Sequence, residues 1–502
     1  MVALFINKEK TMKKNLLFCL GIYSIIMILF ITNAYSEEQS LSITDVIQLS
    51  LEKNLQLKVN RVSKDIQKEK YNAVSTIFDP KFNANGSVAS TSAKSEKTIF
   101  RSEIEKMTAS ASKKIQNGDT LRVSLLSKRQ QTKPFYPGTP STKTQFSHNL
   151  SVSYIMPLLQ GRGKSIATTD IQVEKNNLKI EQLLLEQDII NTITIAQIYY
   201  WELYKSKEQH QAKVKSYELA QKFLKTTQEK LKMGLIANND LLQAKAEVAF
   251  REEAVIIAEN TVKNNQDKLI QYIYGNTRMA DNPIELAQKP LFEKLKNIFV
   301  DAEIQKALDY RIDYQVGKIR LEIAKINYDY YKNQALPKLD LSFTVSVEGD
   351  GKSNNIAMEQ FFGGDNYSGQ IDISGEYPWK MRRAEANLSK AVFQKYQKQL
   401  SLENIQQALV MDVRKSLRNV VSLEKRFEST KIALQLAEEK LKMEEDRFKS
   451  GYSTSYNILL FQRDLFNAMV NNINASVDYQ IARVNLDKST GITLEVHQVE
   501  IK

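Results

Sequence analysis

The sequence contains two stretches whose apolar residues recur every seven positions, and each is too long for an ordinary globular helix. The first runs from about residue 163 to 232 and the second from about 381 to 450. Neither contains proline, and the only glycine is Gly163 at the first edge. A helix of about 70 residues is roughly 105 Å long. Both stretches are therefore predicted to be long coiled-coil helices.

The repeated positions form one seam in each stretch. In the first, only His210 interrupts the series Ile189, Ala196, Leu203, Tyr217, Leu224 and Leu231, which Ile193, Tyr200 and Val214 accompany. In the second, Val410 and Leu417 accompany the series Val413, Val420, Phe427, Leu434, Leu441 and Phe448. We expect these seams to pack against neighbouring helices.

Residues 1–36 have the pattern of a secretory signal peptide. Four lysines precede an apolar run from Leu16 to Thr32, and Ala34-Tyr35-Ser36 supplies small residues for cleavage. The alternative is a retained transmembrane anchor, because the run is near the lower length limit for a membrane span. The sequence leaves open whether Met1 or Met12 is the start.

The only cysteine, Cys19, lies inside this apolar run, so the exported chain is expected to hold no disulfide and no thiolate metal site. The formal charge of +12 becomes about +9 without the signal, which carries four lysines and one glutamate. The remaining lysines alternate with glutamates along helices, as on a solvated coiled-coil face. Together with the export signal, this argues against a nucleic-acid partner.

The chain repeats one order of elements. A helix over 42–77, opened by Ser42 and Asp45 as a capping box, precedes strands, the long helix, a reversal at Gly234 and a helix over 238–274. After a connector, a helix over 301–336 precedes strands, a glycine-rich loop through residues 349–364, the second long helix, a reversal at Gly451 and a helix over 454–489. In each half the two shorter helices together nearly match the long helix in length, so they can stack end to end along it.

Equivalent residues recur at constant spacings. Ile47, Leu51, Val59, Tyr71 and Pro80 return 257 residues later as Ile304, Leu308, Val316, Tyr328 and Pro337. Pro157 and Pro378 lie 221 apart, and Gly234 and Gly451 lie 217 apart. We therefore predict an internal duplication with these parts: signal peptide 1–36, first repeat 37–275, connector 276–300, second repeat 301–491 and tail 492–502.

The strand segments alternate apolar and polar residues, as strands do when one face contacts lipid or core and the other water. Asn117-Gly118-Asp119 predicts a hairpin turn, and Tyr136 to Pro140 an exposed loop. Four such strands are too few to close a membrane barrel, and lipid does not tolerate open edges. Three copies sharing one barrel of twelve strands are therefore expected. The alternative is a soluble sheet that caps a coiled coil.

The duplicated order of elements resembles the TolC-like outer membrane efflux proteins (outer membrane factors). The segment 157–163 (PLLQGRG) entering the long helix carries the resemblance, as do the hairpin 234–244 with Asp240, Leu241, Leu242 and Ala244 and the hairpin 448–461 with Gly451, Thr454, Asn457, Ile458 and Leu459. The resemblance covers about residues 42–491.

This resemblance implies a mostly helical α+β fold. Long coiled-coil helices would form a periplasmic α-barrel, and four or more strands per chain would join a transmembrane β-barrel shared by a homotrimer in the outer membrane. The implied function is a porin-like export duct of a tripartite efflux or type I secretion system. Its partners would be itself, outer membrane lipid, a periplasmic adaptor (membrane fusion) protein and an inner-membrane pump of RND or ABC type. It would catalyse nothing and need no cofactor.

By the same resemblance, the glycine hairpins would form the periplasmic tip where an adaptor docks and the duct is gated. The tip residues would be Gly234, Leu235, Asn239, Asp240, Gly451, Ser453, Thr454 and Asn457. Some family members narrow the aperture with carboxylates just beyond the second hairpin. This chain has Asn457 and Leu460 there, with Asp240 and Asp464 as substitutes. The alternative is that these positions form simple helical turns.

No motif indicates enzymatic chemistry. His148, His210 and His497 fall on a strand, a helix seam and the tail, and no HExxH, P-loop or nucleophile-elbow pattern occurs. Two hypotheses remain: a trimeric export duct, and a periplasmic or surface coiled-coil interaction protein without a channel. The sequence does not identify the cargo as a drug, a metal ion or a polypeptide, nor the class of pump.

Overall fold

The computed structural model describes residues 40–95, 98–134, 142–275, 284–294, 299–364 and 366–499. The expected signal peptide and the loop expected over 136–140 lie outside these residues. The chain divides into two compact units. One comprises residues 59–188 and 301–413 and contains a large sheet; the other comprises residues 189–300 and 414–500 with the chain before 59 and contains both helical reversals.

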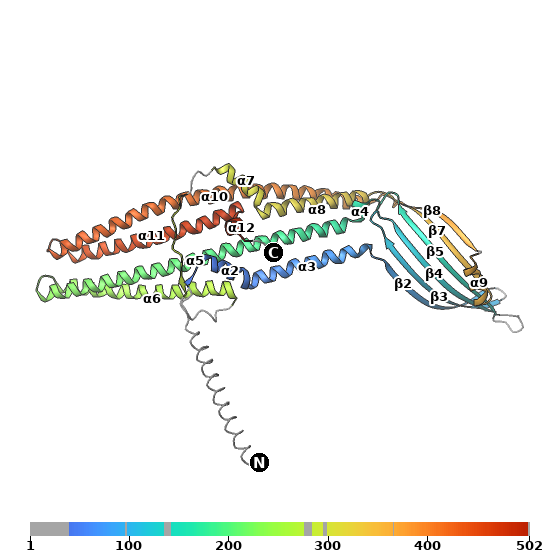
Figure 1. The fold of residues 1–502 in the computed structure, drawn as a ribbon, viewed down its shortest axis with the longest axis horizontal. Coiled ribbons are helices and arrows are strands. Elements are labelled where there is room, and N and C mark those ends of the chain that lie inside the picture. Colours follow the sequence, from blue (N-terminus) through green and yellow to red (C-terminus); the bar gives the residue numbers. More distant parts are fainter. Residues whose placement is uncertain are drawn as a thin grey trace, which may run out of the picture. The chain divides into compact units, whose positions relative to one another are not determined.

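The sheet has six strands in the order β2-β3-β4-β5-β7-β8, and every neighbouring pair is antiparallel (Figure 1). The strands are β2 (Lys81–Ser95), β3 (Thr98–Lys114), β4 (Thr120–Pro134), β5 (Lys143–Pro157), β7 (Lys338–Gly351) and β8 (Tyr367–Glu376). The predicted turn at Asn117-Gly118 joins β3 to β4. The two repeats meet where β5 pairs with β7.

The six strands agree with the expectation of four or more per chain, and they exceed the four on which the barrel of twelve was based, because the polar span after β2 is itself strand. β3 is rich in serine, lysine and glutamate, yet all of its inner positions pair on both sides. The half of β3 that contains Glu103 and Glu105 is stabilised by ion pairs with β4, since Arg129 contacts Glu105 at 2.9 Å and Lys133 contacts Glu103 at 3.8 Å. Cross-strand charge pairs of this kind support a strand that lacks apolar residues.

The glycine-rich loop expected between β7 and β8 is mostly helix. β7 continues to Gly351, and α9 (Asn354–Gly363) follows, capped by the Ser353 hydroxyl, which accepts from the amide of Ile356. Gly349 and Gly351 lie so close to α9 that an added Cβ would meet its backbone at 2.1 and 2.7 Å. The two glycines thus serve a close strand–helix approach as well as flexibility.

The long helices are α5 (Thr169–Lys232, 64 residues) and α10 (Arg382–Lys449, 68 residues). The first is shorter than predicted, because Thr168 leaves helical geometry and separates it from the single turn α4 (Lys164–Ala167). Other helices are α6 (Asn238–Tyr274), α11 (Ser455–Thr490), α12 (Thr493–Val496) and the short 3₁₀ turn η1 (Thr76–Phe78). Separately, β1 (Ser40–Leu41) pairs with β6 (Glu285–Leu286) in a two-stranded parallel sheet.

The helices expected over 42–77 and 301–336 are each broken in two. The pairs are α2 (Ile43–Lys53) with α3 (Leu55–Ser75), and α7 (Val300–Tyr310) with α8 (Ile312–Gln334). Asn54 is extended, and its side chain caps the next helix at the amide of Leu57 while donating to the carbonyl of Tyr272 at 2.7 Å. Arg311, 257 residues later, is extended too and pairs with Asp313 and Asp412. The capping box of Ser42 and Asp45 is present as predicted.

The seam residues predicted from the heptads are buried or half-buried throughout. In α10 the register holds from Val413 to Phe448. In α5 it drifts beyond His210: Ser216 and Phe223 are buried, whereas Tyr217 and Leu224 are half-buried.

The largest core of the helical unit surrounds Tyr200 and Leu203 on α5. The other buried members come from α2, α5, α6 and α11 and are Val46, Ala196, Trp201, Leu269, Ile273 and Val477. The Tyr200 hydroxyl, buried with this core, accepts from the amide of Gln288 at 2.9 Å. The connector segment 284–294 is thereby held against α5.

Candidate functional site

Strand register brings most apolar side chains of the sheet onto one face. Residues directly opposite each other share a face, and the row Val123, Val152 and Val345 crosses three strands without interruption. The apolar face consists of Phe82, Ala84, Gly86 and Val88 on β2; Met107, Ala109 and Ala111 on β3; Leu121, Val123 and Leu125 on β4; Leu150, Val152, Tyr154 and Met156 on β5; Leu339, Leu341, Phe343, Val345 and Val347 on β7; and Tyr367, Ile371 and Ile373 on β8.

This apolar face is exposed. Phe82 is 81% exposed, Val345 59% and Ile371 70%, and large apolar side chains on all six strands are exposed with them. The opposite face carries mainly serine, threonine, asparagine and charged residues. There Ser153 and Thr344 hydrogen bond at 3.0 Å and Ser346 and Ser368 at 2.7 Å. A contiguous exposed apolar surface backed by a polar one marks a site that contacts lipid or another protein.

The apolar face has a defined length along the strands. On β7 it extends over nine residues, from Leu339 to Val347, which matches the length of about 9–11 residues of a tilted membrane-spanning strand. Above it the same face becomes charged, with the pairs Arg129–Glu105 and Lys133–Glu103. Within the face, near the β3–β4 turn, Tyr154 donates to the carboxylate of Asp119. The face therefore has the length of a membrane-spanning strand and ends at a charged border on β3 and β4.

Two strand edges of the sheet have no partner among the described residues. β2 and β8 each pair on one side only, and every residue of β8 is exposed. Open edges leave rows of unsatisfied amides and carbonyls, which lipid does not tolerate. A sheet with this apolar face therefore requires a further strand at each edge.

Both predicted reversals are tight and depend on a glycine. Gly234 has φ +74° and Gly451 has φ +83°, a conformation that side chains with a Cβ rarely adopt. After the first, the amide of Leu235 returns to the carbonyl of Lys230 at 3.0 Å; after the second, Tyr452 returns to Arg447 at 2.9 Å. Each long helix thus ends in a Schellman-type turn.

The two hairpins pack against each other in one cluster. Phe223, Ala244, Phe448, Ile458 and Leu459 are its buried members, one or more from each of α5, α6, α10 and α11. The rings of Phe223 and Phe448 are 5.7 Å apart, and the Lys230 ammonium lies 3.8 Å from the centre of the Phe448 ring. This cluster holds the two hairpins together, and it contains none of the residues predicted for the tip.

The individual tip residues differ in their contacts. Asp240 accepts from the amide of Ala237 at 3.2 Å and so caps α6, and Thr454 accepts from the amide of Asn457 to cap α11. Gly234, Leu235, Asn239 and Gly451 are exposed. Ser453 donates a short hydrogen bond to Glu444. Of the residues considered for an aperture, Asp464 is exposed, whereas Asp240, Asn457 and Leu460 are half-buried.

Two charged residues of the hairpins were not predicted from the sequence. Glu444 is buried and bonds Ser453 and Arg447, and Arg251 is buried against Ser216 and Glu247. Glu444 lies three residues after Leu441 and four before Phe448, so it shares the helix face of these two seam residues. A charged residue on that face was the signal that could have identified it.

The histidines lie apart. His148 is buried on β5 and contacts Asn354 at 3.1 Å, His210 is half-buried on α5, and His497 contacts Gln197 at 3.1 Å. Among the described residues, no group of three histidine, cysteine, aspartate or glutamate side chains is placed to hold a metal ion. No helix in the described ranges is both long and apolar enough to cross a bilayer.

Comparison with known proteins found one matching family and several solved structures with a similar fold. Residues 304–492 match the family described as outer membrane efflux protein. The outer membrane channel CmeC of Campylobacter jejuni has a TM-score of 0.65 at 16% identity, covering 90% of this chain and 86% of that chain. VceC of Vibrio cholerae has a TM-score of 0.65 at 14% identity, covering 89% and 96%. The open state of the MtrE channel of Neisseria gonorrhoeae has a TM-score of 0.59 at 15% identity, covering 90% and 89%. A search of curated proteins found no match.

Proposed function

We propose that this chain is a TolC-like outer membrane efflux protein and that it conducts substrates passively across the outer membrane; the family match over residues 304–492 and the similarity of its fold to solved channels support this. The observation that carries the proposal is the exposed apolar face, which has the length of a membrane-spanning strand and crosses all six strands. A strand sheet of this kind is stable in lipid only when its edges are closed.

Closure by three copies gives a different barrel from the one predicted. Because each chain supplies six strands, a homotrimer supplies eighteen, not twelve. Barrels of 16 to 18 strands are wide enough to enclose an aqueous channel. The polar face of the sheet would line this channel, and the apolar face would contact outer membrane lipid.

The internal duplication supplies a register for the edge pairing. Within the chain, the end of the first repeat pairs with the start of the second, where Val152 lies opposite Val345. At the spacings of 221 and 257 residues, Val152 corresponds to Ile373 and Val345 to Val88. In the trimer, β8 of one copy would therefore pair with β2 of the next, with Ile373 opposite Val88. This register keeps the apolar faces of both strands on the same side.

The hairpin cluster supports a separate role for the helical unit. Two exposed glycine turns held together by a buried cluster suit docking by a helical hairpin of a periplasmic adaptor. The proposed partners are this adaptor and an inner-membrane pump of RND or ABC type, in a tripartite efflux or type I secretion system, with localisation in the outer membrane and the periplasm. The tip residues named from sequence remain the proposed docking and gating positions.

Membrane fractionation with a urea wash, followed by an unheated gel, tests the channel. A wash-resistant trimer is expected. A washable rod would refute the channel and favour a coiled-coil interaction protein.

Pairs of introduced cysteines test the proposed pairing of β8 of one copy with β2 of the next. With Val88→Cys and Ile373→Cys, disulfides should link separate copies; the matched control, Ala89→Cys with Ile373→Cys, places the thiols on opposite faces and should not cross-link. Wash-resistant trimers without cross-links in the first pair would refute this register.

A further inference from the structure

The segment that joins β8 to α10 follows the last apolar row of the sheet directly. This segment contains Tyr377, Trp379 and Lys380, and α10 opens with Arg382 and Arg383, so all five lie within seven residues. Tyr377 is 64% exposed and Trp379 is 88% exposed. Large aromatic side chains that border an apolar band are typical of the interface between hydrocarbon and headgroups. The position of this segment is therefore that of a membrane interface.

A cavity of about 740 Å³ lies at this segment. Its lining brings together four cations, Lys338, Lys380, Arg382 and Arg383, with one carboxylate, Glu376. The remaining lining is mostly polar or aromatic and includes Gln160, Tyr330, Tyr331, Gln334 and Asn387. Such a volume and charge fit an anionic headgroup with hydrogen-bonding hydroxyls.

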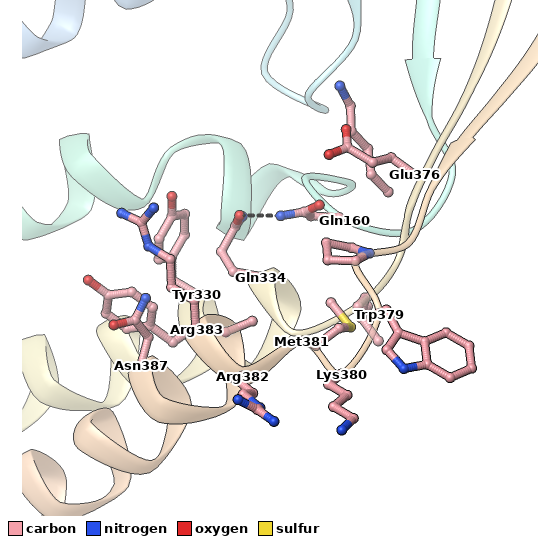
Figure 2. A pocket seen from close by; sticks show the side chains of 15 residues that line it. Gln160, Tyr330, Gln334, Glu376, Trp379, Lys380, Met381, Arg382, Arg383 and Asn387 are labelled. Atoms are coloured by element: carbon pink, nitrogen blue, oxygen red, sulfur yellow. Dashed lines mark hydrogen bonds between the residues drawn. The ribbon is translucent and has the colours of Figure 1, made fainter.

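Three of the four cations are available for a ligand. Lys338 is paired with Asp340 at 3.5 Å. Within the part of the chain that the structure describes, the side chains of Lys380, Arg382 and Arg383 make no hydrogen bond or ion pair. Figure 2 shows Arg383 directed toward Tyr330, while Lys380 and Arg382 point to the same side of the turn, and Trp379 points away from Gln160 and Gln334.

The backbone of the turn is strained where the cations are presented. Lys380 has φ +76° and Met381 has φ +27°, and neither residue is glycine. Left-handed conformations at such residues are uncommon, and they concentrate at ligand sites and switches. The strained turn lets the cations follow Trp379 at once instead of after a longer loop.

We infer that this cavity binds the headgroup of an anionic phospholipid in the periplasmic leaflet, with its acyl chains against the apolar face near Ile371 and Ile373. The inference rests on the proposed membrane insertion. Arginine and lysine would bind the phosphate, the tyrosine and amide side chains the glycerol hydroxyls, and Trp379 would lie at the level of the ester groups.

Trp379 provides a direct reporter. The chain has two tryptophans, and Trp201 is buried in the helical core, so Trp201→Phe leaves Trp379 as the only one. The full-length Trp201→Phe protein is reconstituted in phosphatidylcholine vesicles that contain a minor share of either brominated phosphatidylglycerol or brominated phosphatidylcholine. Bromine quenches tryptophan only at short range, so the difference between the two lipids measures selective binding.

We expect stronger quenching by the anionic lipid. Each cation near the surface should contribute about fivefold to the preference, and the variant Lys380→Gln, Arg382→Gln, Arg383→Gln should lose it. The matched control, Arg414→Gln, Lys415→Gln, Arg418→Gln, removes the same charge from exposed positions about 48 Å farther along α10 and should keep the preference.

Equal quenching by the two lipids would overturn the inference, as would a preference that survives the first triple substitution. Absent quenching by both lipids would overturn it too, because Trp379 would then lie outside the membrane interface. The urea wash separates these outcomes from failure of the proposed function. A wash-resistant trimer without lipid preference refutes only the headgroup site, whereas a washable protein refutes membrane insertion itself.

Discussion

Val345 offers a direct test of which face of the sheet contacts lipid. It lies on the apolar face of β7, opposite Val152 and 59% exposed, and its neighbour Thr344 faces the polar side. Arginine near the bilayer midplane destabilises an outer-membrane barrel by about 2–4 kcal/mol. For Val345→Arg this corresponds to a decrease of about 30- to 700-fold in the equilibrium constant for folding, per chain. All three copies of a trimer would carry the change.

Thr344→Arg is the matched control, since it adds the same side chain one residue away. It removes one hydroxyl hydrogen bond to Ser153, worth about 1 kcal/mol, and places the guanidinium on the wet face. The assay is urea unfolding of the protein reconstituted in vesicles, with the folded fraction read on an unheated gel. We expect a large drop in the urea midpoint for Val345→Arg and a small one for Thr344→Arg. Equal midpoints for the two variants would refute the assignment of faces.

Three further predictions concern the helical unit. Gly451→Pro, at a residue with φ +83°, should weaken coupling to an adaptor while trimers form normally, because the change is confined to the hairpin; normal export by this variant would contradict the tip assignment. Phe448→Ala should cost about 3–5 kcal/mol in the hairpin cluster and speed amide hydrogen exchange at the ends of α10 and α11, with the exposed Tyr452→Ala as control. Burial lowers the pKa of His497, so as the pH falls the unfolded state binds this proton before the folded state does, and the stability of the fold should decrease below about pH 6.5. Amide hydrogen exchange of α12 at pH 7 and pH 5 measures this decrease. The variant His497→Gln should remove the pH dependence.

Long-range periodicity made the helices predictable. Seven-residue repeats and the absence of proline located α5 and α10, and Gly234 and Gly451 located their reversals. The strand β3 was missed, because its serine, lysine and glutamate residues have low strand preference and gain their support from Arg129 and Lys133 on β4. The breaks at Asn54 and Arg311 were missed too, since each is stabilised by partners distant in sequence, Tyr272 and Asp412.

The exposed apolar face of the sheet was predictable only in part. Alternation identified an apolar face on each strand separately, but joining the faces required the register of six strands. The cavity beside Trp379 was not predicted, because its lining comes from the segment before α5, from α8 and β7, and from the segment entering α10.

By itself the sequence determined the long helices, the glycine reversals, the duplication and the resemblance to outer membrane efflux proteins. These depend on local propensity and on repeated spacing, which a single chain displays along its length. Three features could be read only from the folded chain: the number of strands, the union of their apolar residues into one face, and the group of cations that lines the cavity beside Trp379. Each of these depends on pairing between residues far apart in the chain, and a one-residue change of register would move every side chain of a strand to the opposite face.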